Sequence, residues 1–80
     1  MISVGDIETI LESKMPGAVI AVQDLTGTSD HFEVRVVWQV FRGKSLIEQH
    51  KLVNQALEDA LEDGRIHAMK IKTYTPEQMK

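Results

Sequence analysis

Three histidines are the side chains of this 80-residue chain best suited to bind a metal ion, because the chain contains no cysteine. They are His31, His50 and His67. Neutral imidazole binds iron, zinc and copper, whereas thiolate ligands, disulfides and a cysteine nucleophile are excluded within this chain. Any metal must therefore be held by histidine, aspartate or glutamate, or by sulfur that a partner molecule supplies.

The hydroxyl groups give no sign of catalysis. Serine, histidine and aspartate are all present, but no pattern places Ser29 or Ser45 beside an activating base that an acid orients. We therefore expect no enzymatic activity.

Length and composition indicate one small globular domain over residues 1–80. Apolar residues make up 42% and charged residues 26% of the chain, which argues against intrinsic disorder. No apolar run reaches the roughly 18–20 residues of a membrane-spanning helix, and the first residues lack the features of a secretory signal. We expect a cytoplasmic protein without membrane contact. The net charge of −3 also argues against a dedicated nucleic-acid binder.

Residues 3–17 predict an N-terminal helix. Ser3 followed by Asp6 has the spacing of a capping box, and Pro16 ends the helix because its ring removes a backbone donor. Apolar residues recur between these ends at three- and four-residue spacing. They are Val4, Ile7, Ile10 and Leu11.

Two strands are expected after this helix. The apolar, β-branched segment from Ala18 to about Leu25 predicts the first. The second is the clearest pattern in the sequence, because apolar residues alternate with mostly polar ones and so line one buried face. These apolar residues are Phe32, Val34, Val36, Trp38 and Val40. The polar second face indicates that helices cover only one side of the sheet.

A helical region is expected from Leu46 to Glu62. Ser45 can cap its start, and Gly64 is suited to end it. One apolar stripe holds Leu46, His50, Val53, Leu57 and Leu61, which predicts a packed histidine at position 50. Other apolar residues fall outside this stripe, so the region either buries two faces or breaks near His50 into two helices.

The predicted order of elements is helix, strand, strand, one or two helices, and a last strand over residues 66–74. A hairpin is antiparallel and a strand–helix–strand crossover usually returns parallel. We therefore expect a two-layer α/β fold with a three-stranded mixed sheet, covered by helices on one face. Parallel neighbours lie about 4.8 Å apart and begin at the same edge of a sheet. His31 and His67 would share that edge and could ligate one metal centre.

Several segments together resemble the BolA family across nearly the whole chain. They are Ser29-Asp30-His31-Phe32, Phe41-Arg42-Gly43-Lys44-Ser45-Leu46, Gln49-His50-Lys51-Leu52-Val53-Asn54, and Arg65-Ile66-His67-Ala68-Met69 leading into Thr73-Tyr74-Thr75-Pro76-Glu77. Their order and spacing make the resemblance specific, and it implies a class II KH-like fold with the order αββααβ. The chain departs from the family at Gln49, where arginine is frequent, and at Met79, where many members have tryptophan.

The resemblance also implies a function. BolA proteins pair with monothiol glutaredoxins, and the pair holds a bridging [2Fe-2S] cluster whose sulfur ligands come from the glutaredoxin cysteine and glutathione. His67 matches the family's C-terminal ligand, and His31 is the candidate for the second, with Asp30 placed to orient its ring. We therefore expect an interaction module that regulates iron–sulfur cluster trafficking or iron homeostasis. Without its partner it is expected to hold no cofactor and to be a monomer or a weak homodimer.

A DNA-binding transcriptional regulator is the alternative function that the resemblance implies. Arg42, Gly43 and Lys44 stand where class II KH domains carry a Gly-x-x-Gly loop that clamps a nucleic-acid backbone. A basic strip would also contain Arg35, Lys51, Lys70 and Lys72. Only one glycine is present in the loop, and a turn requires Gly43 whether or not a nucleic acid binds.

Overall fold

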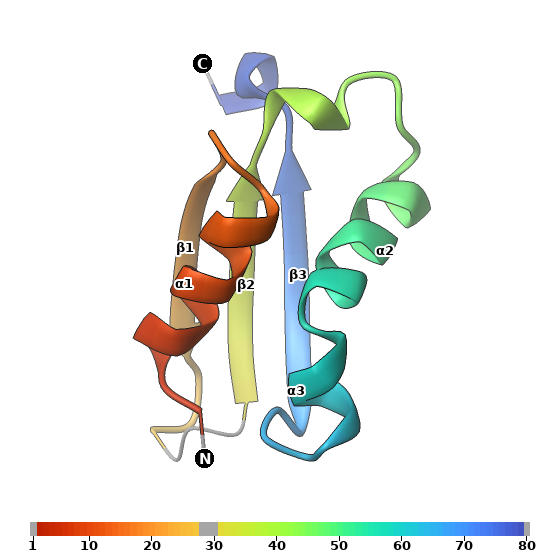
Figure 1. Cartoon of the computed structure of the whole chain (residues 1–80). Coiled ribbons are helices and arrows are strands. Elements are labelled where there is room, and N and C mark those ends of the chain that lie inside the picture. Colours follow the sequence, from red (N-terminus) through yellow and green to blue (C-terminus); the bar gives the residue numbers. More distant parts are fainter. Residues whose placement is uncertain (1, 28–30, 80) are drawn as a thin grey trace.

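Two layers, a sheet and the helices that cover it, make up the protein in the computed structural model, which describes residues 2–27 and 31–79 (Figure 1). The elements are α1 (Val4–Lys14), β1 (Val19–Asp24), β2 (His31–Val37), the 3-10 helix η1 (Gln39–Phe41), α2 (Leu46–Ala56), α3 (Glu58–Glu62), β3 (Ala68–Tyr74) and the 3-10 helix η2 (Pro76–Met79). This sequence of helices and strands confirms the predicted αββααβ order.

Strand β2 lies in the middle of the sheet formed by the described residues, between β1 and β3. It pairs antiparallel with β1, where Val19 lies opposite Val37. It pairs parallel with β3, where His31 lies opposite Ala68. α1 lies over β1 and β2, and α2 runs beside β3 on the same side of the sheet (Figure 1). The predicted mixed sheet with helices on one face is confirmed.

The apolar core fills the space between the sheet and the helices. It consists of Ile2, Ile7, Leu11, Met15, Phe32, Val34, Val36, Phe41, Val53, Ala56, Leu57, Ala60 and Ile66. Phe32, Val34 and Val36 alternate along β2 with residues that are partly or fully exposed, such as Glu33 and Arg35. Burial of one face explains why the sequence of this strand alternates.

Both long helices begin at the serine that the sequence predicts. Ser3 Oγ accepts a hydrogen bond from the backbone N–H of Asp6, and Asp6 Oδ2 accepts one from the N–H of Ser3, each at 3.1 Å. Ser45 and Glu48 form the same reciprocal pair at the start of α2. These bonds satisfy backbone donors that have no partner within a helix. Among the described helices, none has the length and apolar character needed to cross a membrane.

Strand β2 ends at Val37, and the prediction that it continues to Val40 is wrong. The N–H of Trp38 still donates to the carbonyl of Tyr74, but the chain then turns into η1. Val40 is consequently 44% exposed, and Phe41 is 1% exposed and enters the core instead. A single 3-10 turn shifts the apolar face by one residue, which an alternating pattern cannot reveal.

The helical region breaks at Leu57, not near His50. The apolar stripe predicted for it is also wrong in part, because Leu46 is 60% exposed. Residues that face the core are Gln49, Val53, Ala56, Leu57 and Ala60. This buried face contains an amide and two alanines beside the larger apolar residues, so hydrophobicity alone does not identify it. His50 is half-buried beside it.

Candidate metal centre

His31 and His67 lie at the same edge of the sheet. His31 is the first residue of β2, its Cα partner is Ala68, and Ala68 is the first residue of β3. Adjacent strands are about 4.8 Å apart and consecutive Cα atoms 3.8 Å apart, so the Cα atoms of the two histidines are less than about 9 Å from each other. This register brings the backbones of the two histidines together at one edge of the sheet.

His67 is exposed at the point where the chain enters β3. The residue before it, Ile66, is buried, and its N–H donates to the carbonyl of Ala60 in α3 at 3.0 Å. Met69 and Ile71 of β3 face the helices and pack against the core. His67 does not continue this buried row, so it is not a core histidine. Its position between a buried anchor and a strand fixes the backbone and leaves the ring at the surface.

His31 is half-buried and belongs to the row of β2 residues that faces away from Phe32. Its Nδ1 atom is buried, so a metal bond from this residue would be made by Nε2. The carbonyl of His31 accepts a hydrogen bond from the N–H of Leu25 at 2.8 Å, which closes the hairpin between β1 and β2.

A hollow of about 420 Å³ opens beside His31. It is lined by Leu25, Thr26, His31, Phe32, Ala68, Met69 and Lys70. Most of these side chains are apolar, and Leu25 is 44% exposed. The edge that carries the two histidines therefore also presents an apolar surface that a partner could cover.

The donors that the described part of the chain offers at this edge are the two imidazoles. Within residues 2–27 and 31–79, no three or more histidine, aspartate or glutamate side chains form a group that could hold a metal ion. Two imidazoles are available, and the chain has no thiolate. This donor set fits a centre whose remaining ligands come from another molecule. Ser29 and Asp30, which carried sequence predictions, lie outside the described residues.

The three residues predicted for nucleic-acid binding are only partly available. Arg42 forms an ion pair with Glu77, and the hydrogen bond from Arg42 lowers the pKa of that carboxyl. Lys44 is half-buried, and it lines a hollow together with Lys51 and Glu48. Gly43 has a φ of +75°, so the turn itself requires glycine.

The other basic residues lie on a different surface, the uncovered face of the sheet. Glu33 Oε1 is 3.2 Å from Lys72 Nζ, and Glu33 Oε2 is 3.5 Å from Arg35 Nε. The hydrogen bond from Lys72 is the main cause of the lowered pKa of Glu33. The structure therefore divides the predicted basic strip into two groups, and Glu33 partly neutralises one of them.

Gln49 has a structural role that the sequence does not reveal. Its amide Nε2 donates to the carbonyls of Lys44 at 3.0 Å and Phe41 at 3.4 Å. Its Oε1 accepts from Thr73 Oγ1. The residue that departs from the family pattern thus ties the turn before α2 to β3, and one of its partners, Thr73, is 24 residues away in the sequence.

Known proteins resemble this chain in sequence and in structure. The chain matches the family described as BolA-like protein over residues 4–78. It is 42% identical over 74 residues to an uncharacterized protein of Rickettsia prowazekii, a match that covers 92% of this chain and 95% of that protein. It is 40% identical over 82 residues to protein BOLA2 of Arabidopsis thaliana, with 100% of this chain and 86% of that protein covered.

Two further comparisons concern DNA binding and the fold. A protein of Vibrio cholerae named DNA-binding transcriptional regulator BolA is 44% identical over 52 residues, which are 65% of this chain and 48% of that protein. The crystal structure of a Bol-like protein from Babesia bovis superposes with a TM-score of 0.83 at 32% identity, covering 98% of this chain and 90% of that one.

Proposed function

This chain belongs to the BolA-like family, and from that premise we propose that it is an interaction module that binds a monothiol glutaredoxin and provides imidazole ligands to a shared [2Fe-2S] cluster. The observation that carries the proposal is the parallel pairing of His31 with Ala68, which brings His67 beside His31 at one edge of the sheet. Both residues belong to sequence segments that resemble the family.

Ligand chemistry supports a shared centre. Iron–sulfur clusters are held mainly by cysteine thiolates, and this chain has none. Mixed histidine and cysteine ligation raises the reduction potential of a [2Fe-2S] cluster compared with all-cysteine ligation. The sulfur ligands would come from the glutaredoxin cysteine and glutathione, and His67 and His31 would replace one or two of the remaining ligands.

The surface around the histidines supports a docked partner. His67 is exposed, and the hollow beside His31 is mainly apolar. Burial of such a surface favours association, and it would bring the partner's sulfur ligands to the edge where the imidazoles lie. The role is to regulate the retention or transfer of clusters, in the cytoplasm, without chemistry of its own.

Visible circular dichroism tests this function. The protein is mixed with a monothiol glutaredoxin that carries a [2Fe-2S] cluster and glutathione, and we expect the spectrum of the cluster to change. His67→Ala should abolish or alter that change. His50→Ala is the matched control, because His50 lies within α2, and it should behave like the wild type. An unchanged spectrum with the wild-type protein would contradict the proposal.

DNA binding is the second candidate, because a relative from Vibrio cholerae bears the name of a DNA-binding transcriptional regulator. Arg42, Lys44 and Lys51 would contact phosphates, and retardation of DNA should then weaken as salt is added. The ion pair of Arg42 with Glu77 reduces the charge available for this purpose. No retardation at low salt would eliminate this candidate.

A further inference from the structure

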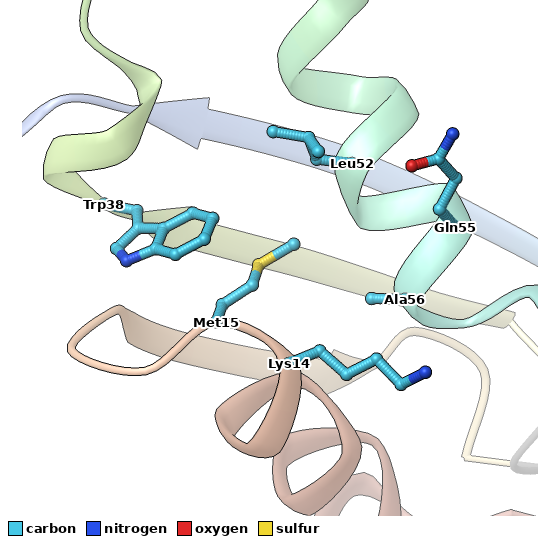
Figure 2. A pocket seen from close by; sticks show the side chains of 6 residues that line it. All are labelled: Lys14, Met15, Trp38, Leu52, Gln55 and Ala56. Atoms are coloured by element: carbon cyan, nitrogen blue, oxygen red, sulfur yellow. The ribbon is translucent and has the colours of Figure 1, made fainter.

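A preformed cleft lies between the two long helices, at the C-terminal end of α1 (Figure 2). Its volume is about 250 Å³, and its walls are Lys14, Met15, Trp38, Leu52, Gln55 and Ala56. Figure 2 shows the rings of Trp38 and the side chain of Met15 at the floor, with Leu52 and Ala56 of α2 across from them. The floor and the far wall are therefore apolar, and polar groups stand at the rim.

The floor is held rigidly by contacts outside the cleft. Trp38 Nε1 donates to the carbonyl of Pro16 at 3.0 Å, and the indole packs edge-on against Phe41 with a centroid distance of 5.5 Å. Met15 is 2% exposed. Because the indole N–H is already bonded, Trp38 presents an apolar ring surface to the cleft. Beside it, Met15 contributes a polarizable thioether.

The rim of the cleft is cationic. Lys14 stands on α1, and Leu52 and Gln55 separate the cleft from a second hollow of about 190 Å³ that Lys44 and Lys51 border. Among residues 2–27 and 31–79, the ion pairs engage other cations and none of these three lysines. The carboxylate of Glu48, which caps α2, also borders the second hollow and offsets part of the charge of Lys44 and Lys51 there, whereas Lys14 lines the cleft itself. This surface thus complements a negatively charged ligand.

The size of the cleft selects the kind of ligand. Sites for cofactors and drug-sized molecules usually enclose about 300–1,000 Å³, and this one is smaller. One large apolar side chain fits such a space, and a buried apolar anchor surrounded by polar contacts is the usual core of a protein interface.

We infer that the cleft between α1 and α2 binds an acidic peptide segment of a partner protein, which inserts one phenylalanine or leucine side chain between Met15, Trp38 and Leu52. Carboxylates on either side of that anchor would meet Lys14 on α1, and Lys44 and Lys51 at the second hollow. Trp38 follows the last residue of β2, whereas His31 is its first. Seven residues of strand separate the two sites by about 23 Å, so this interaction goes beyond the proposed function and can occur together with it.

Fluorescence of Trp38, the only tryptophan in the chain, reports on the cleft directly. The peptide acetyl-Glu-Asp-Phe-Asp-Glu-amide is titrated into the protein at low salt, and we expect a saturable change in emission. Replacing its phenylalanine by alanine should weaken binding by about tenfold or more, because the anchor no longer buries its ring. The peptide acetyl-Gln-Asn-Phe-Asn-Gln-amide, which lacks the charges, should bind about threefold to fivefold more weakly.

Substitutions of exposed residues test whether the peptide binds in this cleft, and they leave the core intact. Lys14→Glu and Gln55→Glu each place a carboxylate at the rim, and both should weaken the acidic peptide about fivefold or more at low salt. Lys70→Glu is the matched control for Lys14→Glu, because it makes the same charge change on the uncovered face of the sheet and should leave binding unchanged. The inference is overturned if emission does not saturate up to millimolar peptide. Equal binding of the alanine peptide, or equal weakening by Lys70→Glu, would also overturn it, since either result means attraction by net charge alone. His67→Ala should not affect the peptide, which separates this test from that of the cluster.

Discussion

Gln49 and Thr73 form a buried side-chain hydrogen bond of 2.5 Å between α2 and β3. They are 8% and 7% exposed, and the same glutamine also bonds the turn that leads into α2. One side chain thereby fixes the second helix, the preceding turn and the third strand relative to one another. Because β3 follows directly from His67, this bond also helps to hold in register the strand next to the candidate ligand.

Loss of the hydroxyl at position 73 should destabilise the protein. Thr73→Val keeps the volume but leaves Gln49 Oε1 without its donor, so we expect the free energy of unfolding in urea to fall by about 1–3 kcal/mol. Gln49→Leu should also destabilise, and the double variant should lose less than the sum of the two single losses. Strict additivity would show that the two side chains do not interact.

Two consecutive residues test where β2 ends. Phe41 is buried and Val40 is exposed, so Phe41→Ala should lower the free energy of unfolding by about 3–5 kcal/mol. Val40→Ala should change it by less than about 1 kcal/mol. Thermal or urea unfolding measures both. If the strand continued to Val40, as its alternating sequence suggests, the two effects would be reversed.

The capping carboxylates of Asp6 and Glu48 make the stability of the folded protein dependent on pH. The backbone N–H of Ser45 lowers the pKa of Glu48, and the N–H of Ser3 lowers that of Asp6. A carboxyl whose pKa is lower in the folded state stabilises the protein above its unfolded pKa, and this contribution is lost as the pH falls through the folded pKa. Glu48→Gln should therefore reduce the melting temperature at pH 7, and the difference from wild type should shrink below about pH 4. A difference that stays constant across this range would exclude the charged cap as its cause.

A thiolate in place of the proposed imidazole should change the shared cluster without abolishing it. His67→Cys supplies a ligand at the same position, and we expect the complex with the cluster-bearing glutaredoxin to form with a lower reduction potential than the wild type. Redox titration followed by visible circular dichroism measures this shift. An unchanged potential, together with an unchanged spectrum for His67→Ala, would mean that position 67 is not a ligand.

The basic residues separate the two candidate functions. Replacing Arg42, Lys44 and Lys51 together by glutamine should leave the circular dichroism of the shared cluster as in the wild type. The same variant should lose any retardation of DNA, and the salt dependence of binding should become shallower as phosphate contacts disappear. Retention of the cluster signal by His67→Ala combined with loss of DNA binding by the glutamine variant would favour the regulator.

The sequence by itself determined the order of the elements, the mixed sheet and both serine caps. These features depend on local rules: the alternation of Phe32, Val34 and Val36, the capping pairs, and the handedness of crossovers. The placement of His31 near His67 also followed from topology, because parallel neighbours begin at one edge. The exposure of His67 did not follow, since its alternation with Met69 and Ile71 is also the pattern of a histidine that completes the core.

Only the tertiary structure decided which side chains enter the core beyond β2 and which face of α2 is buried. Phe41 replaces Val40 because a 3-10 turn intervenes, and Gln49 is buried because Thr73 and two carbonyls, up to 24 residues away, satisfy its amide. The cleft beside Trp38 arises in the same way, from residues of α2, of the C-terminal end of α1 and of the segment that follows β2. Local sequence patterns carry no information about partners that chain folding brings together from distant segments, and these partners determine burial.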